Sequence, residues 1–501
     1  MTESQLGNEA LDYGTGIGFP QADAQIQKAL EAHEGVTDIG NLTGGGALQR
    51  HSLEDNLALL APQLKHLSIW SDLHKSSAKS TLEEYTTQDG YGSSDSAFTS
   101  QLGLPENISG DYNRQFAVTK YLRSVWQVAD VLTATQTLVG AEMVEKQAAL
   151  IRVLRAFNTG LYNGDEDVLP VQVNGLEKTA KTQGGANVID LNGGNPTIDV
   201  LNQAAESIFT GFGMVNTSKL FVSPGVNTAI SAIVRQAEGA GGQNQRVVTV
   251  QGAEGIKLGQ AVTGIQTPYG EVKIRPDMFL GAAYEAHGVP TVRNNARQIV
   301  EGSTHSKAPV TPAVAVAAAN AAVPNSKWGD STRTVRGIGA YRYRVYAFNA
   351  SGRSAASAVS SAVNVVADRG AVITITNNAS DPNPATGYAI LGEAAVGSGR
   401  YALITRVARS SGATTVFTDI NEDIPGTGKA FMLDVTGTGP GRTVSIAQLI
   451  SPYSQQLAKI GPYNWGYVTM APALKYYAPE RIVMIKNIGV TNTRVSANLD
   501  K

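Results

Sequence analysis

Tyr341-Arg-Tyr-Arg-Val-Tyr-Ala-Phe348 alternates in the manner of a β-strand, and Tyr401-Ala-Leu-Ile-Thr-Arg-Val407 is a second segment of the same kind. Both lie in a run of sequence that opens on Pro309 and closes on the loop Pro425-Gly-Thr-Gly428. The chain on either side of this run mixes helical and strand patterns, and the part that follows is too short to fold alone. The sequence therefore predicts a β-sandwich over 309–430, inserted into a body of mixed α and β structure.

The first of these strands has two faces that differ in their aromatic residues. Alternation places Tyr341, Tyr343 and Val345 on one face, and Tyr346 and Phe348 on the other. One of the two sets must belong to the core. The other set could present a sugar-binding face, but we favour stabilisation or decoration of an outer surface, because a fold does not fix a function.

A long helix is predicted over 141–162, on the N-terminal side of the insert. Its apolar residues recur at three- and four-residue spacing and form one stripe: Met143, Leu150, Leu154, Phe157 and Leu161. Asn163-Gly164 is a suitable end for the helix. About 20 residues at ~1.5 Å each make a rod of roughly 30 Å, long enough to be the spine of a domain.

Residues 193–308 predict a second α/β unit. Helices open at Asn195-Pro196 and at Pro224, and the second helix ends at Gly239. Strands are expected at 219–223, 247–250, 262–265 and 271–274. After the insert, strands at 444–450 and 481–485 are expected to return to the body.

Two polar stretches bury too little to become ordered alone. Residues 1–60 predict an extended arm with one short helix near 22–32, and apolar residues in 64–75 would anchor it. The run 76–110 is dense in Ser, Thr, Gly and Asp and is flanked by strand patterns at 81–86 and 113–120, which predicts a long hairpin over about 76–115. Long loops in ordered proteins are usually functional, so we expect both stretches to need a partner surface.

Composition narrows the class of protein. The net charge of −2 argues against strong electrostatic capture of DNA or acidic membranes, and the low charged fraction of 16% suggests a surface covered by neighbours. The absence of cysteine excludes disulfides, thiolate nucleophiles and cysteine-based metal sites. The first six residues lack the features of a signal peptide, and the apolar stretch 313–323 is too short to span a bilayer. We therefore expect a soluble protein made in the cytoplasm.

No motif in the chain carries a chemical signature. Gly14-Thr-Gly-Ile-Gly18 lacks a preceding strand, and Gly44-Gly45-Gly46 lacks the Lys–Ser/Thr of a phosphate-binding loop. Ser223 is not in a nucleophile elbow. The histidines do not form a helical zinc pair: His33, His51, His66, His74, His287 and His305.

Acidic residues near the hairpin lack the spacing of a calcium loop, and solvation or ion pairing is the favoured role: Glu83, Glu84, Asp89, Asp95 and Asp111. Asp165-Glu-Asp167 after the spine helix is interpreted as a solvated turn. We accordingly predict that the protein is not an enzyme and binds no cofactor. We also predict that it has no catalytic, cofactor-binding or metal-binding residue.

The order of these parts resembles the major capsid proteins of tailed bacteriophages, of the Hong Kong 97 type. Leu220-Phe-Val-Ser-Pro224, followed by a helix, is similar to the strand–helix step of the family's axial domain. The segment 267–280 resembles a Gly–x–Val hairpin of one large capsid subfamily. The resemblance covers about 60–300 and 431–490. It implies an α+β capsid fold with an N-terminal arm, an extended hairpin loop, a spine helix, peripheral and axial domains, and an inserted all-β sandwich.

The resemblance also implies a division of the chain into five parts. They are an arm (1–60), a peripheral domain with the extended loop and spine helix (61–192), an axial domain (193–308), the insert (309–430) and return strands (431–501).

The insert resembles a fibronectin type III or immunoglobulin-like sandwich. Tyr343-Arg-Val-Tyr-Ala-Phe-Asn-Ala-Ser-Gly-Arg-Ser354 is similar to the tyrosine strand and turn of that family. Segments 387–391, 401–404 and 417–419 are similar to other strands of the sandwich. The Tyr343 strand precedes the Tyr388 strand, so a rearranged strand order stays open.

The function that the resemblance implies is that of a coat protein. Copies of the chain would form the hexamers and pentamers of an icosahedral head in the virion, assembled in the host bacterial cytoplasm, with the arm and hairpin lying on neighbouring subunits. Packaged double-stranded DNA would lie inside without specific binding, and portal, scaffold or cement proteins would be further partners. Two alternatives stay open: a tail or surface adhesion protein whose β-domain binds glycans, and an enzyme with an accessory β-module.

Overall fold

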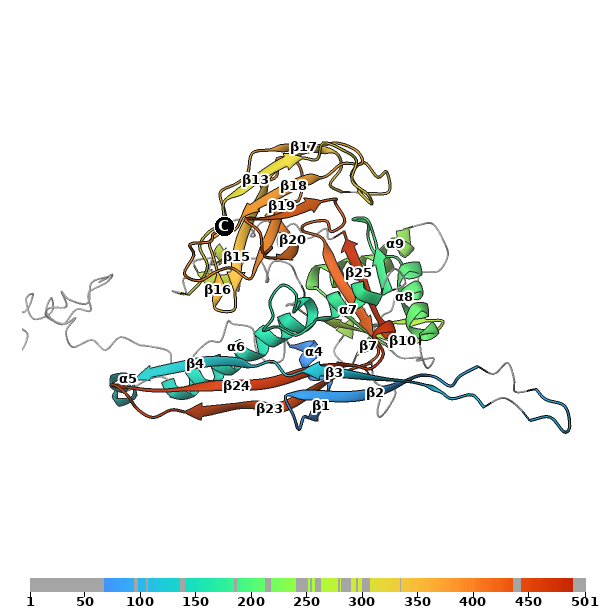
Figure 1. Ribbon diagram of the computed structural model, residues 1–501, viewed down its shortest axis with the longest axis horizontal. Helices are drawn as coiled ribbons and strands as arrows, with labels where there is room; N and C mark the ends of the chain where they lie inside the picture. The colour runs from blue at the N-terminus through green and yellow to red at the C-terminus, as the bar shows by residue number, and fades with distance from the viewer. Residues whose placement is uncertain are drawn as a thin grey trace, which may run out of the picture. The chain divides into compact units, whose positions relative to one another are not determined.

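The computed structural model describes residues 67–489 except 94–97, 105–106, 136–139, 184–186, 212–217, 240–250, 253–254, 257–262, 278–279, 281–289, 294–295, 300–306, 334, 400 and 436–442. The arm, the helix expected near 22–32 and the strand expected at 247–250 lie outside the described residues. Figure 1 shows the helices and strands of the described part of the chain.

The first body sheet has four strands in the order β1-β23-β24-β4. Their bounds are β1 His74–Ser77, β23 Val444–Gln456, β24 Tyr463–Tyr476 and β4 Leu122–Ala129. The β1 strand runs parallel to β23, and the other pairs are antiparallel. The long central strand β24 had no counterpart among the sequence predictions. Before the spine helix the chain forms β3 (Asp111–Val118), β4 and the short helix α5 (Asp130–Ala134).

The spine helix α6 (Ala141–Asn163) packs on this sheet, close to the range expected from its apolar stripe. Leu154, Phe157 and Leu161 are buried against the sheet residues Val468 and Met470. Met143, expected on the same stripe, is instead exposed in the first turn of the helix. In the described part of the chain, no helix combines the length and the apolar character needed to cross a membrane.

The second body sheet has six strands in the order β5-β25-β22-β6-β10-β9. Their bounds are β5 Val188–Asp190, β25 Ile482–Ile488, β22 Gly428–Leu433, β6 Ser218–Val222, β10 Gly270–Pro276 and β9 Gly264–Thr267. Helices α8 (Ile198–Thr210) and α9 (Pro224–Gly239) share one apolar cluster with this sheet. The Thr197 side chain accepts a hydrogen bond from the Val200 N–H and so caps α8.

Two expected domain boundaries fall inside this sheet. Strand β22 pairs with β6 from Ala430 onward and begins at Gly428, so the chain is already back in the body before the expected boundary at 430. Strand β5 lies in the same sheet, although it precedes the expected boundary at 192. Both ends were misjudged because a strand of three to six residues next to a glycine-rich loop has too few alternating positions to be distinguished from the loop.

The insert contains nine strands and no helix between 307 and 427, with residue 334 and residue 400 outside the described set. One sheet has the order β13-β18-β21, with bounds Val314–Ala318, Ala371–Thr376 and Thr414–Asp419. A second has the order β16-β15-β19-β20, with bounds Gly352–Arg353, Tyr343–Asn349, Gly387–Glu393 and Tyr401–Ala408. A third pairs β14 (Gly339–Tyr341) with β17 (Val363–Val365).

The core of the insert lies between the first two of these sheets. Tyr343 and Val345 of β15 are buried in one cluster with Ile373 and Ile375 of β18. Tyr341 belongs to the same cluster, so the face that carries Tyr341, Tyr343 and Val345 is the core face.

The opposite face of the β15–β19–β20 sheet is also covered. Tyr346 and Tyr401 are only 5% and 6% exposed, and they pack in a cluster with Leu391. The guanidinium groups of Arg353 and Arg344 lie 5.5 and 5.9 Å from the Tyr346 and Tyr401 ring centroids. The aromatic side chains of this sheet are therefore not displayed as a stacking surface for a sugar.

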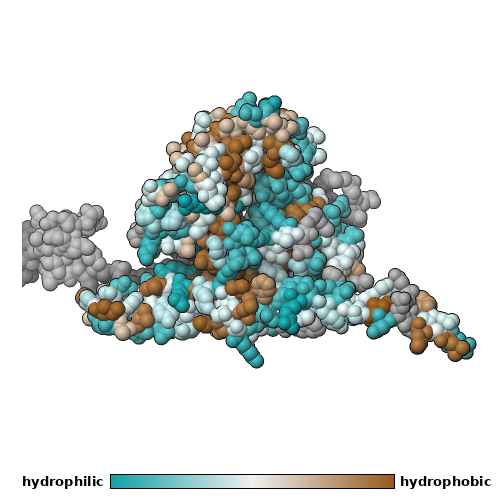
Figure 2. Space-filling view, viewed as in Figure 1, coloured by the Kyte–Doolittle hydropathy of each residue, from teal (hydrophilic) through white to brown (hydrophobic). Residues whose placement is uncertain are grey.

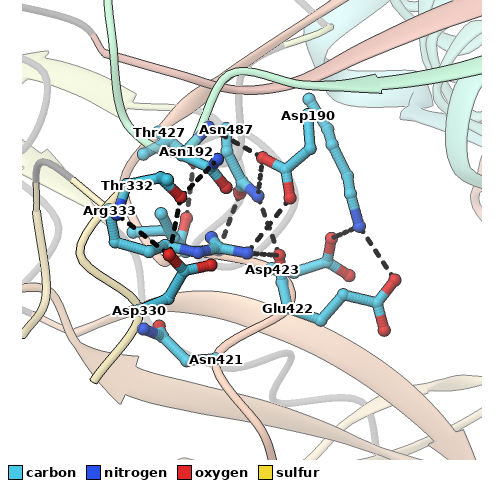
Figure 3. Close-up of polar contacts among 12 residues, drawn as sticks. Asp190, Asn192, Asp330, Thr332, Arg333, Asn421, Glu422, Asp423, Thr427 and Asn487 are labelled. Atoms are coloured by element: carbon cyan, nitrogen blue, oxygen red, sulfur yellow. Dashed lines mark hydrogen bonds and ion pairs between the residues drawn. The ribbon is translucent and has the colours of Figure 1, made fainter. Parts of the chain in front are cut away.

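A polar network joins the insert to the body (Figure 3). Arg333, whose side chain is almost fully buried, lies 3.1 Å from Asp190 of β5. Asn487 of β25 donates to the Asp190 carboxylate at 2.8 Å and to the Glu422 carbonyl at 2.7 Å, and its own amide oxygen accepts from the Ile424 N–H. The amide of Asn487 thus satisfies groups on both sides of the junction, which fixes the insert to the edge of the six-stranded sheet.

Charged side chains continue the junction next to this network. Lys486, also buried, lies 2.9 Å from Glu422 and 3.4 Å from Asp423. Glu177 of α7 (Leu176–Gln183) accepts from Lys429 and from Lys181 at 2.9 Å, and Lys181 reaches Asp423 at 3.2 Å. Burial alone would raise the pKa of Glu177, but the charges of Lys429 and Lys181 outweigh it and hold the pKa well below its ordinary value. Burial would likewise raise the pKa of Asp423, but the charges of the neighbouring lysines outweigh it and lower the pKa.

These lowered pKa values predict that acid loosens the junction. A carboxyl group whose pKa is lower in the folded state stabilises the fold above its unfolded pKa, about 4.3 for Glu and 3.9 for Asp, and this contribution is lost as the pH falls further. We expect the melting temperature of the wild-type chain to drop below about pH 4.5, and that of Glu177→Gln to drop less over the same range. Calorimetry between pH 3 and pH 7 measures the difference. Glu84→Gln, which removes an exposed hairpin carboxylate, is the control, and parallel curves for Glu177→Gln and wild type would contradict the assignment.

Candidate assembly interface

The expected hairpin is formed by β2 (Leu82–Gly90) and β3 (Asp111–Val118), which pair antiparallel from Leu82 opposite Val118 to Gly90 opposite Asp111. The register shifts between Gln88 and Gly90, where a bulge interrupts the ladder. Strand β2 of the hairpin continues a few residues beyond the expected 81–86. The pairing there involves polar residues, which show no alternation of apolar and polar positions in the sequence.

The root of the hairpin is fixed to the first body sheet. Lys475 of β24 donates to Glu83 at 2.9 Å, and both side chains are largely buried. This hydrogen bond lowers the pKa of Glu83. The Tyr85 hydroxyl lies 3.2 Å from both the backbone N–H and the carbonyl of Tyr476, and its ring packs on Tyr477. The root is therefore part of the folded subunit.

The end of the hairpin has the opposite character. Tyr91, Phe98, Leu102 and Leu104 are between 90 and 98% exposed. Figure 2 shows hydrophobic residues gathered on this hairpin. We call these four residues the hairpin patch. Burying a side chain of this size is worth about 1.5–3 kcal/mol, and the subunit gains none of it here, so the patch indicates a surface that a partner covers.

A second exposed apolar group lies where the first body sheet turns. Val131 and Leu132 of α5 and Ile460 of the β23–β24 turn are all exposed. We call these three residues the turn patch. Asp130 holds their elements together, because its N–H donates to the Pro462 carbonyl and its carboxylate lies 2.6 Å from Lys459. The turn patch is thus a second apolar surface, distinct in sequence from the hairpin patch.

The acidic turn after the spine helix is neutralised within the chain. Lys178 lies 2.6 Å from Asp165 and also pairs with Asp167, and Lys120 lies 2.7 Å from Glu166. The turn was expected to be solvated, but two lysines that are distant from it in sequence satisfy its carboxylates. Across the described residues, no group of three or more acidic or histidine side chains is arranged to hold a metal ion.

The structure describes only some of the other residues weighed in the sequence, and it does not bring those into one site. His74 is an exposed residue of β1, and the other five histidines lie outside the described residues. Asp95 and both glycine-rich segments, Gly14–18 and Gly44–46, also lie outside them. Glu84 pairs across the hairpin with Arg114 at 3.5 Å, and Ser223 is buried directly before α9. The described members of this group therefore form no common cluster.

One cavity of about 280 Å³ lies between α6, α7 and strand β20 of the insert. Its lining includes Lys178, Lys181 and Lys429. Each of these lysines already forms an ion pair with a carboxylate of the same chain. The charges of this cavity are thus already paired, whereas the side chains of the two apolar patches are exposed in the described part of the chain.

The sequence of the chain is similar to those of known capsid proteins. Residues 36–308, more than half of the chain, match the family model described as SU10 major capsid protein. The chain is 22% identical over 476 residues to the major capsid protein of Staphylococcus phage S25-3, with 93% of this chain and 96% of that protein covered. The major capsid protein of Staphylococcus phage K has the same identity and the same coverage.

Solved structures with weaker likeness include the capsid of a native GTA particle, with 8% identity, a TM-score of 0.44 and coverage of 90% of this chain and 99% of that chain. The capsid of Cyanophage P-SCSP1u has 10% identity, a TM-score of 0.41 and coverage of 90% and 96%. The match of the family model over most of the body and both full-length relatives agree with one another, and the chain belongs to the SU10 major capsid protein family.

Proposed function

We propose that this major capsid protein of tailed phages builds an icosahedral head by covering the hairpin patch of each subunit with a neighbouring copy. The observation that carries the proposal is the contrast along one hairpin: a root held by Lys475 and Tyr476, and an apolar end that no described residue of the subunit buries. The turn patch supplies a second surface of different composition. Two unlike surfaces favour heterologous contacts, which close into rings such as pentamers and hexamers.

The finer fold assignment is part of this proposal. The long hairpin, the spine helix α6 and the two body sheets support a Hong Kong 97-like arrangement in which the four-stranded sheet is the peripheral domain and the six-stranded sheet is the axial domain. The two sheets of the insert with Tyr343 and Ile373 packed between them support an immunoglobulin-like sandwich. Lys181 and Lys486 of the body pair with Asp423 and Glu422 at its base and hold this sandwich on the body.

The same proposal places the chain in the virion shell after assembly in the bacterial cytoplasm. A net charge of −2 suits a shell around packaged double-stranded DNA, because a strongly basic lining would retain each phosphate that it neutralised. Portal, scaffold and cement proteins are partners of other surfaces. A structural, non-enzymatic role agrees with the pairing of the cavity lysines, and the burial of Tyr346 and Tyr401 argues against the glycan-binding alternative.

Expression of the full chain, followed by size-exclusion chromatography and negative-stain microscopy, tests the proposal. We expect closed particles built from rings of subunits. A population of fibres or trimers would support the adhesion protein instead, and a small soluble oligomer under all conditions would contradict shell formation.

A further inference from the structure

The insert has two outer sheet faces, and they differ in what covers them. The outer face of the β15–β19–β20 sheet is buried around Tyr346 and Leu391. In the described part of the chain, the side chains on the outer face of the β13–β18–β21 sheet are exposed or half-buried. Strand pairing aligns its side chains in rungs, which are Ala315–Thr374–Val416 and Ala317–Val372–Thr418. We call these six residues the neutral face. Their inward neighbours, including Ile373 and Ile375, form the core of the sandwich.

The neutral face contains no charge. The sequences of strands β13, β18 and β21 are VAVAA, AVITIT and TTVFTD. The one charged residue in them, Asp419, is buried and pairs with Arg336. Val416 is 55% exposed, and both Ala315 and Ala317 are exposed. The solvent side of an antiparallel sheet normally carries polar or charged residues, and edge strands normally carry charges that prevent pairing. A flat face of Ala, Val and Thr, with two uncharged edge strands, is suited to contact with another uncharged sheet.

The size of the face decides what kind of partner can use it. Three strands about 4.8 Å apart and about 17 Å long present roughly 240 Å², so two such faces in contact bury on the order of 500 Å² in total. A stable complex between free proteins needs about 1,200 Å² or more. A freely diffusing partner would therefore not stay bound to this face. A partner that is already held nearby by other contacts benefits from its high effective concentration and can use a contact of this size.

We propose that the neutral face packs against the neutral face of an insert from a neighbouring subunit in the assembled shell. This inference depends on the proposed function, because the shell is what brings the second copy into place. A face that contacts its own copy must do so about a two-fold axis, and an icosahedral shell has such axes between its rings. Small side chains without charge allow two sheets to approach to about 10 Å without desolvating an unpaired ion. The contact joins neighbouring rings and adds to the stability of the particle.

The absence of cysteine from all 501 residues permits a direct test. Thr374→Cys places one thiol on the central strand of the neutral face, where a two-fold contact brings it close to its own copy. Val359→Cys, at an exposed insert position outside these three strands, is the matched control. Assembled particles are treated with a bis-maleimide reagent that spans about 10 Å, the spacing of packed sheets. We expect covalent dimers of the Thr374→Cys chain at least tenfold above the Val359→Cys control, and none from dissociated subunits.

A second variant measures the energetic effect of the contact. Val416→Glu should lower the denaturant concentration at which particles dissociate, with no change in the unfolding of the dissociated subunit, since Val416 is exposed there. Closed particles in which the Thr374→Cys thiol accepts a monofunctional maleimide but forms no dimers would overturn the inference and leave the proposed function standing. A thiol that is already protected in dissociated subunits would also overturn it, because another segment of the same chain would then cover the face. Failure of the wild-type chain to form closed particles would instead contradict the proposed function.

Discussion

Replacing Phe98, Leu102 and Leu104 with serine should abolish shell assembly and leave the subunit folded. All three side chains are at least 95% exposed, so the folded subunit loses no contact, and its free energy of unfolding should change by no more than about 0.5 kcal/mol. In the shell each side chain would lose about 1.5–3 kcal/mol of burial, or about 5–9 kcal/mol for the three. Since about 1.4 kcal/mol is a factor of ten, the concentration needed for assembly should rise more than a thousandfold.

Analytical ultracentrifugation of the triple variant measures particle yield, and chemical denaturation measures the stability of the subunit. Val310→Ser, at an exposed apolar position of the insert, is the control and should assemble as wild type does. A normal yield of particles from the triple variant would remove the hairpin patch from the interface. A shortened variant in which Asn-Gly replaces 91–110 keeps Glu83 and Tyr85 in place, and it should also fold without assembling. Deleting 80–110, by contrast, would remove the root as well, and loss of assembly would then have two explanations.

The sequence predicted the function through the order of the parts, and the family match and the relatives confirm a tailed-phage major capsid protein. It did not identify the residues of the interface. The stretch 76–110 was interpreted as a polar segment that needs a partner surface, and the four apolar side chains of the hairpin patch were not singled out. A signal was present: Phe98, Leu102 and Leu104 lie in a loop that has nothing of its own to bury them against.

Strand β24 shows why one central element escaped prediction. Residues 468–474 are buried on both faces, so the run Val-Thr-Met-Ala-Pro-Ala-Leu has no alternation. Pro472 also argues against a central strand, because it has no N–H for the ladder. The structure accommodates it where the register with β23 shifts next to Gln448, and the Pro472 carbonyl accepts from the Lys120 N–H. The helices α8 and α9 were easier to locate, because Asn195-Pro196 directly precedes the Thr197 cap of α8 and Pro224 is the first residue of α9.

The junction of insert and body could not be read from local pattern, because its partners come from four separate parts of the chain. Glu177, Lys429 and Lys486 meet only once the six-stranded sheet has formed. The clue that the sequence offered is Lys486 inside the apolar run 482–488. A lysine in a fully buried strand is rare unless an acid pairs with it, which predicts a carboxylate partner and leaves its position to the fold.

Arg336→Met is expected to destabilise the insert by about 3–5 kcal/mol, the cost of leaving one member of a buried ion pair without its partner. The Arg336 side chain is fully buried, and its guanidinium lies 2.9 Å from the Asp419 carboxylate and 4.9 Å from the Trp328 ring. Burial alone would lower the pKa of Arg336, but the charge of Asp419 outweighs it and raises the pKa, so the guanidinium stays charged. Methionine keeps much of the apolar volume and leaves Asp419 as a buried charge whose remaining donors are the Tyr343 hydroxyl and the Asn421 N–H.

Hydrogen exchange measured by mass spectrometry separates this effect from general instability, because peptides of the insert and of the body are followed at once. Protection in β15, β18 and β21 should fall, and protection in α6 and β24 should fall far less, since the ion pair lies inside the sandwich. Arg114→Met is the matched control: its side chain is 75% exposed beside Glu84, and an exposed pair contributes about 0–1 kcal/mol. Adding Asp419→Asn to Arg336→Met removes the unpaired buried charge and should restore part of the lost stability of the insert. If Arg336→Met and Arg114→Met lowered the protection of the insert equally little, the Arg336–Asp419 pair would not stabilise the insert. The aromatic core around Tyr341 and Tyr343 alone would then account for its stability.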